Sequence, residues 1–163
     1  MRRGLIVVAL VLLADQASKA WLIGVMAARG DAPLPLTGFF NLVMVWNRGI
    51  SFGLFNTPEQ AALQRWLLAA VALAVVAALL LWMHRARPFI AIVLGAIVGG
   101  ALGNVIDRFV HGAVADFFDV HAAGWHWPAF NLADAAVSLG VAALLADSLL
   151  GTRRADHNRP PRP

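Results

Sequence analysis

The chain has 163 residues, of which 60% are apolar and only 13% are charged, and its formal net charge is +4 at pH 7. With a mean hydropathy of +0.72, this composition is typical of an integral membrane protein rather than a soluble domain. The basic residues lie in short clusters beside apolar runs, so nucleic acid is not an expected partner, and the absence of cysteine excludes disulfides, thiolate nucleophiles and Cys-ligated zinc.

Four apolar runs divide the chain, at residues 5–28, 66–83, 88–106 and 132–150. Each is close to the ~20 residues that an α-helix needs to cross about 30 Å of hydrocarbon, so we predict four transmembrane helices. Residues 1–152 then form a single membrane domain, and the polar, proline-rich tail 153–163 is expected to be disordered. The first run follows a basic start like that of a secretory signal peptide, but its length favours a retained helix.

Arginines mark one side of the predicted bundle. They precede the first span, lie between spans two and three, and follow span four: Arg2, Arg3, Arg85, Arg87, Arg153, Arg154, Arg159 and Arg162. Because basic residues favour the cytoplasmic side, both termini are predicted to be cytoplasmic. Most tryptophans map to the opposite, outer side: Trp21, Trp46, Trp66, Trp125 and Trp127. Only Trp82 maps to the inner side.

The long outer segment between spans one and two has structural signals of its own. Phe39 to Trp46 is a β-prone run closed by the turn-like Asn47-Arg48-Gly49. Thr57-Pro58-Glu59-Gln60 fits a capping box with proline at the first helical position, which predicts a short surface helix leading into the second span. The predicted fold class is therefore an all-α membrane protein of four transmembrane helices, with a small β-containing extracytoplasmic segment and a short surface helix.

The third span has small residues at four-residue intervals: Ala91, Gly95, Gly99 and Gly103. Such a stripe lets another helix approach closely, and inside an apolar span it indicates helix packing rather than a phosphate loop. Asn104, Asp107 and Arg108 extend the same region of the helix surface by i, i+3 and i+4 spacing. This polar end of the span is therefore expected to face protein.

The stretch from Gly103 to Asp134 contains four of the nine acidic residues: Asp107, Asp116, Asp119 and Asp134. The predicted topology brings Asp107, Asp116 and Asp134 to the same outer rim, where ionisable groups indicate a functional site. Two carboxylates held close together share a proton and can act as base and acid, which is the chemistry of an aspartic peptidase. Spacing alone does not choose between Asp107 and Asp116.

Some charged residues have structural interpretations that compete with functional ones. Asp15 and Lys19, one turn apart in the outer half of the first span, fit a simple intrahelical ion pair. Asp107 and Arg108 are as readily a packing and orientation pair as a chemical one.

Further polar residues give little support to other chemistries. Asp119 is interpreted as a solvated loop acid, and Asp147 as bridging Arg153 or solvated at the interface. None of Ser18, Ser51 and Ser138 has a histidine at an evident partnering position, and a His-Glu-x-x-His motif is absent. The histidines between spans three and four are too irregularly spaced to indicate a metal site: His111, His121 and His126.

Five short motifs follow one another along the chain: Asp15-Gln16-Ala17-Ser18-Lys19, Asn47-Arg48-Gly49-Ile50-Ser51-Phe52, Gly103-Asn104-Val105-Ile106-Asp107-Arg108, Val114-Ala115-Asp116-Phe117 and Phe130-Asn131-Leu132-Ala133-Asp134. Together they resemble the lipoprotein signal peptidases, or signal peptidase II, of bacteria. Each motif alone is weak, but five in register over nearly the whole chain are specific. Ala115 departs from the valine that the family often has there.

The resemblance implies an intramembrane aspartic peptidase that cuts the signal peptide from prolipoproteins just before a diacylglyceryl-modified cysteine. The catalytic pair corresponds to Asp116 and Asp134, with Asp107 as support. The implied partners are prolipoproteins and membrane lipid, with no cofactor or metal. A monomer is expected in the bacterial inner membrane, with its active site at the outer leaflet.

The resemblance also assigns roles around the pair. Asn104, Arg108 and Asn131 are implied to position the substrate. The outer loop over the cleft is implied to contain Asn47 and Gly49, while Asp15 and Lys19 brace the first span.

Two other classes of function remain open from the residues alone. Buried ionisable groups in four small spans also fit a proton-coupled transporter, although its groups should occur at several depths rather than at one rim. A noncatalytic scaffold would use the glycine stripe without needing two neighbouring aspartates.

Overall fold

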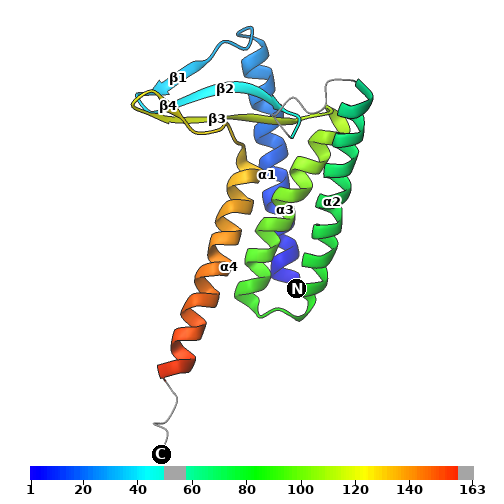
Figure 1. Ribbon diagram of the computed structural model, residues 1–163, viewed down its shortest axis with the longest axis vertical. Coiled ribbons are helices and arrows are strands. Elements are labelled where there is room, and N and C mark those ends of the chain that lie inside the picture. Colours follow the sequence, from blue (N-terminus) through cyan, green and yellow to red (C-terminus); the bar gives the residue numbers. More distant parts are fainter. Residues whose placement is uncertain (50–57, 158–163) are drawn as a thin grey trace, which may run out of the picture.

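The computed structural model describes residues 1–49 and 58–157. Four long helices form a bundle, and a small sheet lies across one end of it, called here the sheet end (Figure 1). The helices are α1 (Arg2–Ala27), α2 (Pro58–Arg85), α3 (Pro88–Val110) and α4 (Leu132–His157). The strands are β1 (Leu34–Thr37), β2 (Phe40–Asn47), β3 (Val114–Ala122) and β4 (Trp125–His126).

All four helices are long and apolar enough to cross a membrane, which confirms the four predicted spans. A helix suits this role because it satisfies its backbone hydrogen bonds within the segment. Large apolar side chains point out of the bundle, as expected of surfaces that face lipid: Leu10, Leu67, Leu81 and Leu139.

Two helices extend beyond the predicted spans. α2 begins at Pro58, which confirms the predicted helix start, but it runs unbroken to Arg85, so the prediction of a separate short surface helix is wrong. Its first turn belongs to α2, because no glycine or proline interrupts the sequence before Pro88. The predicted cap at Thr57 lies outside the described residues. α4 continues to His157, past the point where the tail was predicted to begin.

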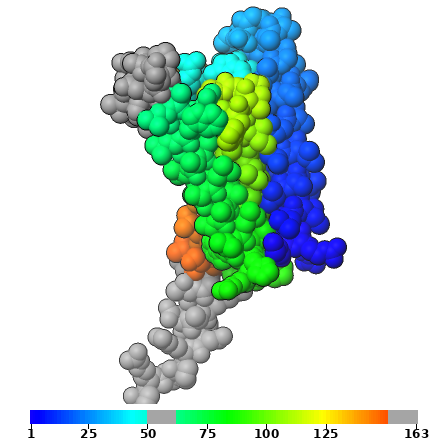
Figure 2. Space-filling view, turned by 90° about the vertical axis from the view of Figure 1, so that its right-hand side faces the viewer, coloured from blue at the N-terminus to red at the C-terminus, as the bar shows by residue number. Residues whose placement is uncertain are grey.

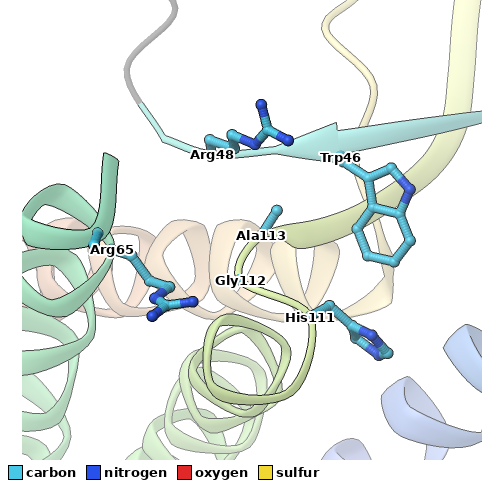
Figure 3. Close-up of a pocket in the computed structure, with 7 residues that line it drawn as sticks. Trp46, Arg48, Arg65, His111, Gly112 and Ala113 are labelled. Carbon is cyan, nitrogen blue, oxygen red and sulfur yellow. The ribbon is translucent and has the colours of Figure 1, made fainter. Parts of the chain in front are cut away.

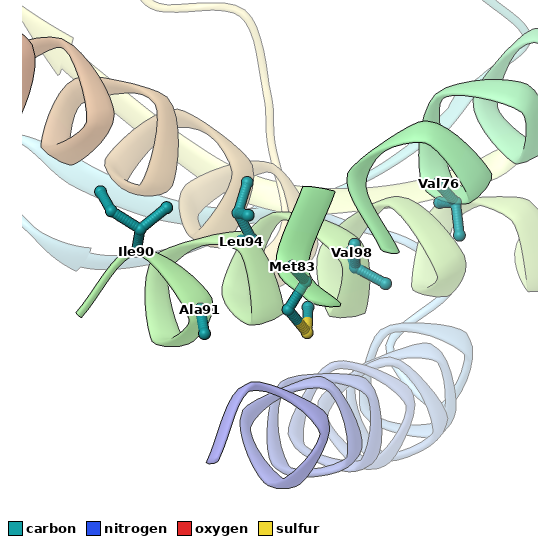
Figure 4. Packing of buried hydrophobic residues seen from close by; sticks show 6 residues of the cluster. All are labelled: Val76, Met83, Ile90, Ala91, Leu94 and Val98. Carbon is teal, nitrogen blue, oxygen red and sulfur yellow. The ribbon is translucent and has the colours of Figure 1, made fainter. Parts of the chain in front are cut away.

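α3 lies at the centre of the bundle and packs against α1, α2 and α4. In the space-filling view, the yellow-green end of α3 lies between α2 and α1 (Figure 2). On its α2 side, α3 contributes to an apolar cluster with Val76 and Met83 of α2 (Figure 4). The α3 members of that cluster are Ile90, Ala91, Leu94 and Val98.

The small-residue stripe of α3 packs closely against another helix, as predicted, and the structure shows that this helix is α1. A Cβ added to Gly95 would meet the backbone of Gly4, and one added to Gly99 would meet Val8 and Val11. Glycine therefore allows these two helices to approach more closely than any residue with a side chain would.

The sheet is antiparallel, with the strand order β1-β2-β3-β4. The predicted β-run is β2, whereas β3 was not predicted, because its two aspartates disfavour a strand. Pairing of β2 with β3 sets Val45 opposite Asp116 and Asn41 opposite Asp119. The sheet packs on the end of α1 through a buried cluster: Leu22, Met26, Leu42, Ala115 and Phe117.

Candidate active site

Asp116 and Asp134 reach the sheet end from different elements. Asp116 lies on β3 with only 1% of its surface exposed, and Asp134 lies half-buried in the first turn of α4. Phe118 of β3 exchanges two backbone hydrogen bonds with Phe130, with N···O distances of 2.8 and 3.1 Å. This bridge returns the chain to β3 immediately before α4 begins, so the two aspartates are brought to one place.

Asn131, the residue before α4, binds both aspartates. Its side-chain Nδ2 donates to Asp116 Oδ1 at 2.7 Å. Its backbone N–H donates to Asp134 Oδ2 at 3.2 Å, while its Oδ1 accepts from the Asp134 N–H at 2.9 Å. This reciprocal pattern is a capping box, in which an N-cap side chain and an acid three residues later satisfy each other's N–H groups. We call Asp116 and Asp134 the Asn131 pair.

Asn104 of α3 holds the other side of Asp134. Its Nδ2 donates to Asp134 Oδ1 at 2.7 Å. Its Oδ1 accepts from Asn131 Nδ2 at 3.2 Å and from Lys19 Nζ at 3.1 Å. Arg108, one turn further along α3, donates through Nη1 to the Asn104 carbonyl at 3.1 Å. The two hydrogen bonds to Oδ1 orient the Asn104 side-chain amide so that its Nδ2 donor faces Asp134.

Asn47, at the end of β2, supplies the second donor to Asp116. Its Nδ2 lies 3.0 Å from Asp116 Oδ2, and its Oδ1 accepts from the Gly49 N–H at 2.9 Å. Gly49 has a φ of 113°, a conformation that glycine adopts without strain. The predicted turn at Asn47-Arg48-Gly49 therefore fixes the Asn47 amide towards the carboxylate.

The pKa of Asp116 is raised to about 6. Burial contributes most, and the negative charge of Asp134 adds to it, while the hydrogen bonds from Asn47 and Asn131 oppose it. No ion pair to either member of the Asn131 pair occurs in the part of the chain that the structure describes. Asp116 is therefore a carboxyl group that can exchange a proton near neutral pH.

A second acidic group, called here the Lys19 cluster, consists of Asp15, Lys19 and Asp107. Lys19 Nζ lies 2.8 Å from both Asp15 Oδ2 and Asp107 Oδ2, and all three residues are buried. The ion pair predicted between Asp15 and Lys19 is therefore present. The cation that pairs with Asp107 is Lys19, so the expected pairing of Asp107 with Arg108 is wrong.

The Lys19 cluster joins three helices and the sheet. Asp15 Oδ1 accepts from the Ala133 N–H of α4 at 3.0 Å, and Asp107 Oδ2 accepts from the Ala115 N–H of β3 at 3.1 Å. Gln16 donates to Asp107 Oδ1 at 3.2 Å. The sequence analysis assigned no role to Gln16. Its position beside Asp15, inside an apolar span, could have indicated that it takes part in a buried polar cluster.

Two acids differ from their predicted surroundings. Asp119 is buried on β3, so its interpretation as a solvated loop acid is wrong. His126 and Asn41 hydrogen-bond its carboxylate and lower its pKa. Asp147 pairs with Arg87, because α3 begins beside the far part of α4. The side chain of its predicted partner, Arg153, lies outside the part of the chain that the structure describes.

The three histidines between α3 and α4 lie in two separate places. His126 stacks on His121 with ring centroids 4.8 Å apart, whereas His111 packs on Trp46. Among residues 1–49 and 58–157, no group of three potential metal ligands is found.

The fold and the site define a multi-pass membrane protein with two neighbouring carboxylates held by neutral amide donors at one end of its bundle. The chain matches the model of the family described as signal peptidase (SPase) II over residues 7–150. It therefore belongs to the signal peptidase II family and is a protease.

Relatives and solved structures agree with this assignment. The chain is 50% identical to the lipoprotein signal peptidase of Methylorubrum extorquens (strain PA1), covering 94% of this chain and 90% of the relative. It is 47% identical to that of Methylobacterium radiotolerans, covering 99% and 94% of the two chains. A solved bacterial membrane enzyme shares the fold, with a TM-score of 0.75 at 22% identity over 99% of this chain and 96% of the other. The transporter and scaffold alternatives find no support in these comparisons.

Proposed function

We propose that this protein removes the signal peptide from diacylglyceryl-modified prolipoproteins, cutting just before the modified cysteine, with Asp116 and Asp134 as its catalytic pair. The relatives that match most of the chain are named lipoprotein signal peptidases. The observation that supports the pair best is that Asn131 hydrogen-bonds both carboxylates. No other two carboxylates among the described residues share a neutral donor without a cation between them.

The proposed reaction is hydrolysis by shared acid and base. Asp134 acts as the base, since the N-terminus of α4 attracts negative charge to that position. It takes a proton from water as the water oxygen attacks the scissile carbonyl, while protonated Asp116 gives its proton to the carbonyl oxygen. The gem-diol then collapses, the nitrogen leaves with a proton, and no covalent intermediate forms.

The remaining residues of the site are proposed to support this chemistry. Asn104 and Asn131 orient the two carboxylates and, with Arg108, contact the substrate backbone. Asn104, Arg108 and Asp134 are half-buried rather than enclosed, which supports access by a substrate. Asn47 and Gly49 line the loop over the site.

The Lys19 cluster is proposed to brace the helices that carry the site. Asp15 and Lys19 hold α1 against α3 and α4, and Asp107 holds β3 through its bond to Ala115. None of the three is proposed to touch the substrate.

We further propose that the protein is a monomer in the bacterial inner membrane, with both termini cytoplasmic and the site at the outer leaflet. Support comes from the arrangement of the chain, because the N-terminus and the arginines between α2 and α3 lie away from the sheet end (Figure 1). Basic residues favour the cytoplasmic side. The signal helix of the substrate would then enter laterally from lipid, with its acyl chains remaining there.

The catalytic assignment is tested by Asp116→Asn and Asp134→Asn in purified protein supplied with a diacylglyceryl-modified prolipoprotein. Each variant should lose about 10²- to 10⁴-fold in cleavage rate, which is the range for a missing acid or base. Asp31→Asn is the matched control, because Asp31 is exposed in the turn after α1. Its φ is positive, and asparagine tolerates this conformation as aspartate does. Normal turnover by Asp116→Asn would disprove the assignment.

A further inference from the structure

A polar cavity lies at the sheet end, apart from the Asn131 pair. It has a volume of about 540 Å³ and opens between the end of β2, the start of α2 and the turn after α3. Its lining consists of Trp46, Arg48, Ala62, Arg65, His111, Gly112 and Ala113 (Figure 3). Neither the Asn131 pair nor the asparagines that bind it line this cavity, which we call the Arg48–Arg65 cavity.

The cavity is cationic. Arg65 reaches from α2 towards the turn at Gly112, and Arg48 lies at the end of β2 (Figure 3). Among the lining residues that the structure describes, none is acidic. The Arg65 Nε is buried and has no hydrogen-bond partner among the described residues. Because a buried donor without an acceptor is unfavourable, an anion with hydrogen-bond acceptors would complete this arrangement.

The turn after α3 is shaped to admit the Arg65 guanidinium. Gly112 has a φ of 77°, and a Cβ at this position would come within 3.1 Å of Arg65 Nη1. The guanidinium also lies over the Trp66 ring, 4.6 Å from its centroid. Arg65 is therefore held in place, which reduces the entropy that it loses on binding a ligand.

Aromatic side chains place the cavity at the level where a membrane meets water. Trp66 and Phe109 pack edge to face at 5.0 Å and are 45% and 53% exposed. Trp46 packs on His111 at the cavity itself. Tryptophan is enriched at the depth of lipid head groups, so this cavity lies where lipid phosphates are found.

We propose that the Arg48–Arg65 cavity binds the phosphate of an anionic phospholipid from the surrounding membrane. The planar fork of a guanidinium matches the oxygens of a phosphate, and the positive charge of Arg48 adds to that of Arg65 at the same cavity. The acyl chains would lie along the exposed apolar surfaces of α2 and α3. This proposal depends on the membrane placement and not on the identity of the catalytic residues.

The test is native mass spectrometry of the full chain in detergent, with phosphatidylglycerol or phosphatidylcholine added at equal concentration. Phosphatidylglycerol should remain bound and phosphatidylcholine should not. Arg48→Gln should weaken phosphatidylglycerol binding about tenfold, the usual effect of losing one charge-assisted contact, and the double variant R48Q/R65Q should abolish it. Higher salt should also weaken binding.

Controls matched in charge separate a site from general attraction to a basic protein. Arg29→Gln removes one exposed charge at the sheet end, and R2Q/R3Q removes two at the other end. Both controls should retain the lipid. Equal losses in variants and controls, or full binding by R48Q/R65Q, would overturn the proposal.

Two further measurements keep the result interpretable. Thermal unfolding shows whether each variant is folded, and Arg48→Gln remains informative if R65Q is unstable, because Arg48 is exposed at a strand end. Soluble glycerol phosphate is added as a competitor. Displacement of the lipid at comparable concentration would show a site for free phosphate and would reject the lipid assignment.

Discussion

The Lys19 cluster and the Asn131 pair are neighbours joined through Asn104. The negative charges of the first are balanced by a cation, whereas those of the second are met by neutral hydrogen-bond donors. Asp15 and Asp107 share the ammonium group of Lys19 and accept backbone N–H bonds from other elements. Among the described residues, Asp116 and Asp134 receive side-chain hydrogen bonds only from amide groups. A cation balances the charge of a buried carboxylate directly, whereas hydrogen bonds from neutral amides orient a carboxylate without adding an opposite charge. The role of a buried acid in this protein therefore follows from the groups that bind its carboxylate and not from burial alone.

Removing the cation should damage the Lys19 cluster most. Lys19→Met leaves Asp15 and Asp107 buried and uncompensated, which should lower the free energy of unfolding by about 3–5 kcal/mol. Thermal unfolding in detergent measures the loss. Adding Asp107→Asn to the same chain should recover part of it, because one of the two unpaired charges is then removed. An unchanged melting temperature for Lys19→Met would contradict the claim that the Lys19 cluster depends on its cation.

Filling the space beside the cluster should have a smaller effect. A Cβ on Gly103 would overlap the Asp15 carboxylate, so Gly103→Ala should destabilise the protein by about 1–3 kcal/mol. Gly24→Ala is the control, since nothing lies within 4 Å of the added Cβ and alanine favours a helix by about 0.5–1 kcal/mol. Equal melting temperatures for the two variants would show that α1 and α3 can separate without cost.

At the Asn131 pair, the expected effect is on the pH dependence of cleavage rather than on stability. With its pKa raised to about 6, Asp116 is protonated below that pH and loses its proton above it, so cleavage should fall as pH rises through 6. The hydrogen bond from Asn47 lowers this pKa. Asn47→Ala should therefore raise it and move the alkaline limb of the pH–rate profile to higher pH.

The measurement for Asn47→Ala is kcat/KM against pH for the variant and the unmodified protein. Lys19→Arg serves as the comparison, because it keeps a cation in the Lys19 cluster and should leave the position of the limb in place. A limb that moves to lower pH in Asn47→Ala would contradict the proposed role of Asp116 as acid.

The smallest effect is expected at the opposite end of the bundle. Arg87 pairs with Asp147, but 63% of the Arg87 side chain is exposed. Exposed ion pairs contribute about 0–1 kcal/mol, so Arg87→Gln should change the melting temperature little and leave cleavage unchanged. If Arg87→Gln lowered the melting temperature as much as Lys19→Met, burial would not explain the difference between the exposed Arg87–Asp147 pair and the buried Lys19 cluster.

Local sequence patterns predicted the elements well and their partners poorly. Composition and spacing predicted the four spans and the strand Phe40–Asn47, with bounds that lie a few residues from the observed ones. They also predicted that the glycine stripe of α3 packs against another helix. β3 was missed because Asp116 and Asp119 are unusual in a strand, and they are tolerated there because asparagines and a histidine satisfy them. The capping box at Asn131 was readable from its Asn-x-x-Asp spacing.

The amino-acid sequence by itself determined that this chain is a four-span membrane protein of the signal peptidase II family, because long apolar runs and short motifs are local properties. Only the tertiary structure decided which charge meets which. Lys19 pairs with Asp107, more than eighty residues away, and Asn131 holds both Asp116 and Asp134. Such partners depend on how α1, α3, α4 and β3 converge, and an electrostatic interaction depends on distance in space rather than separation along the chain.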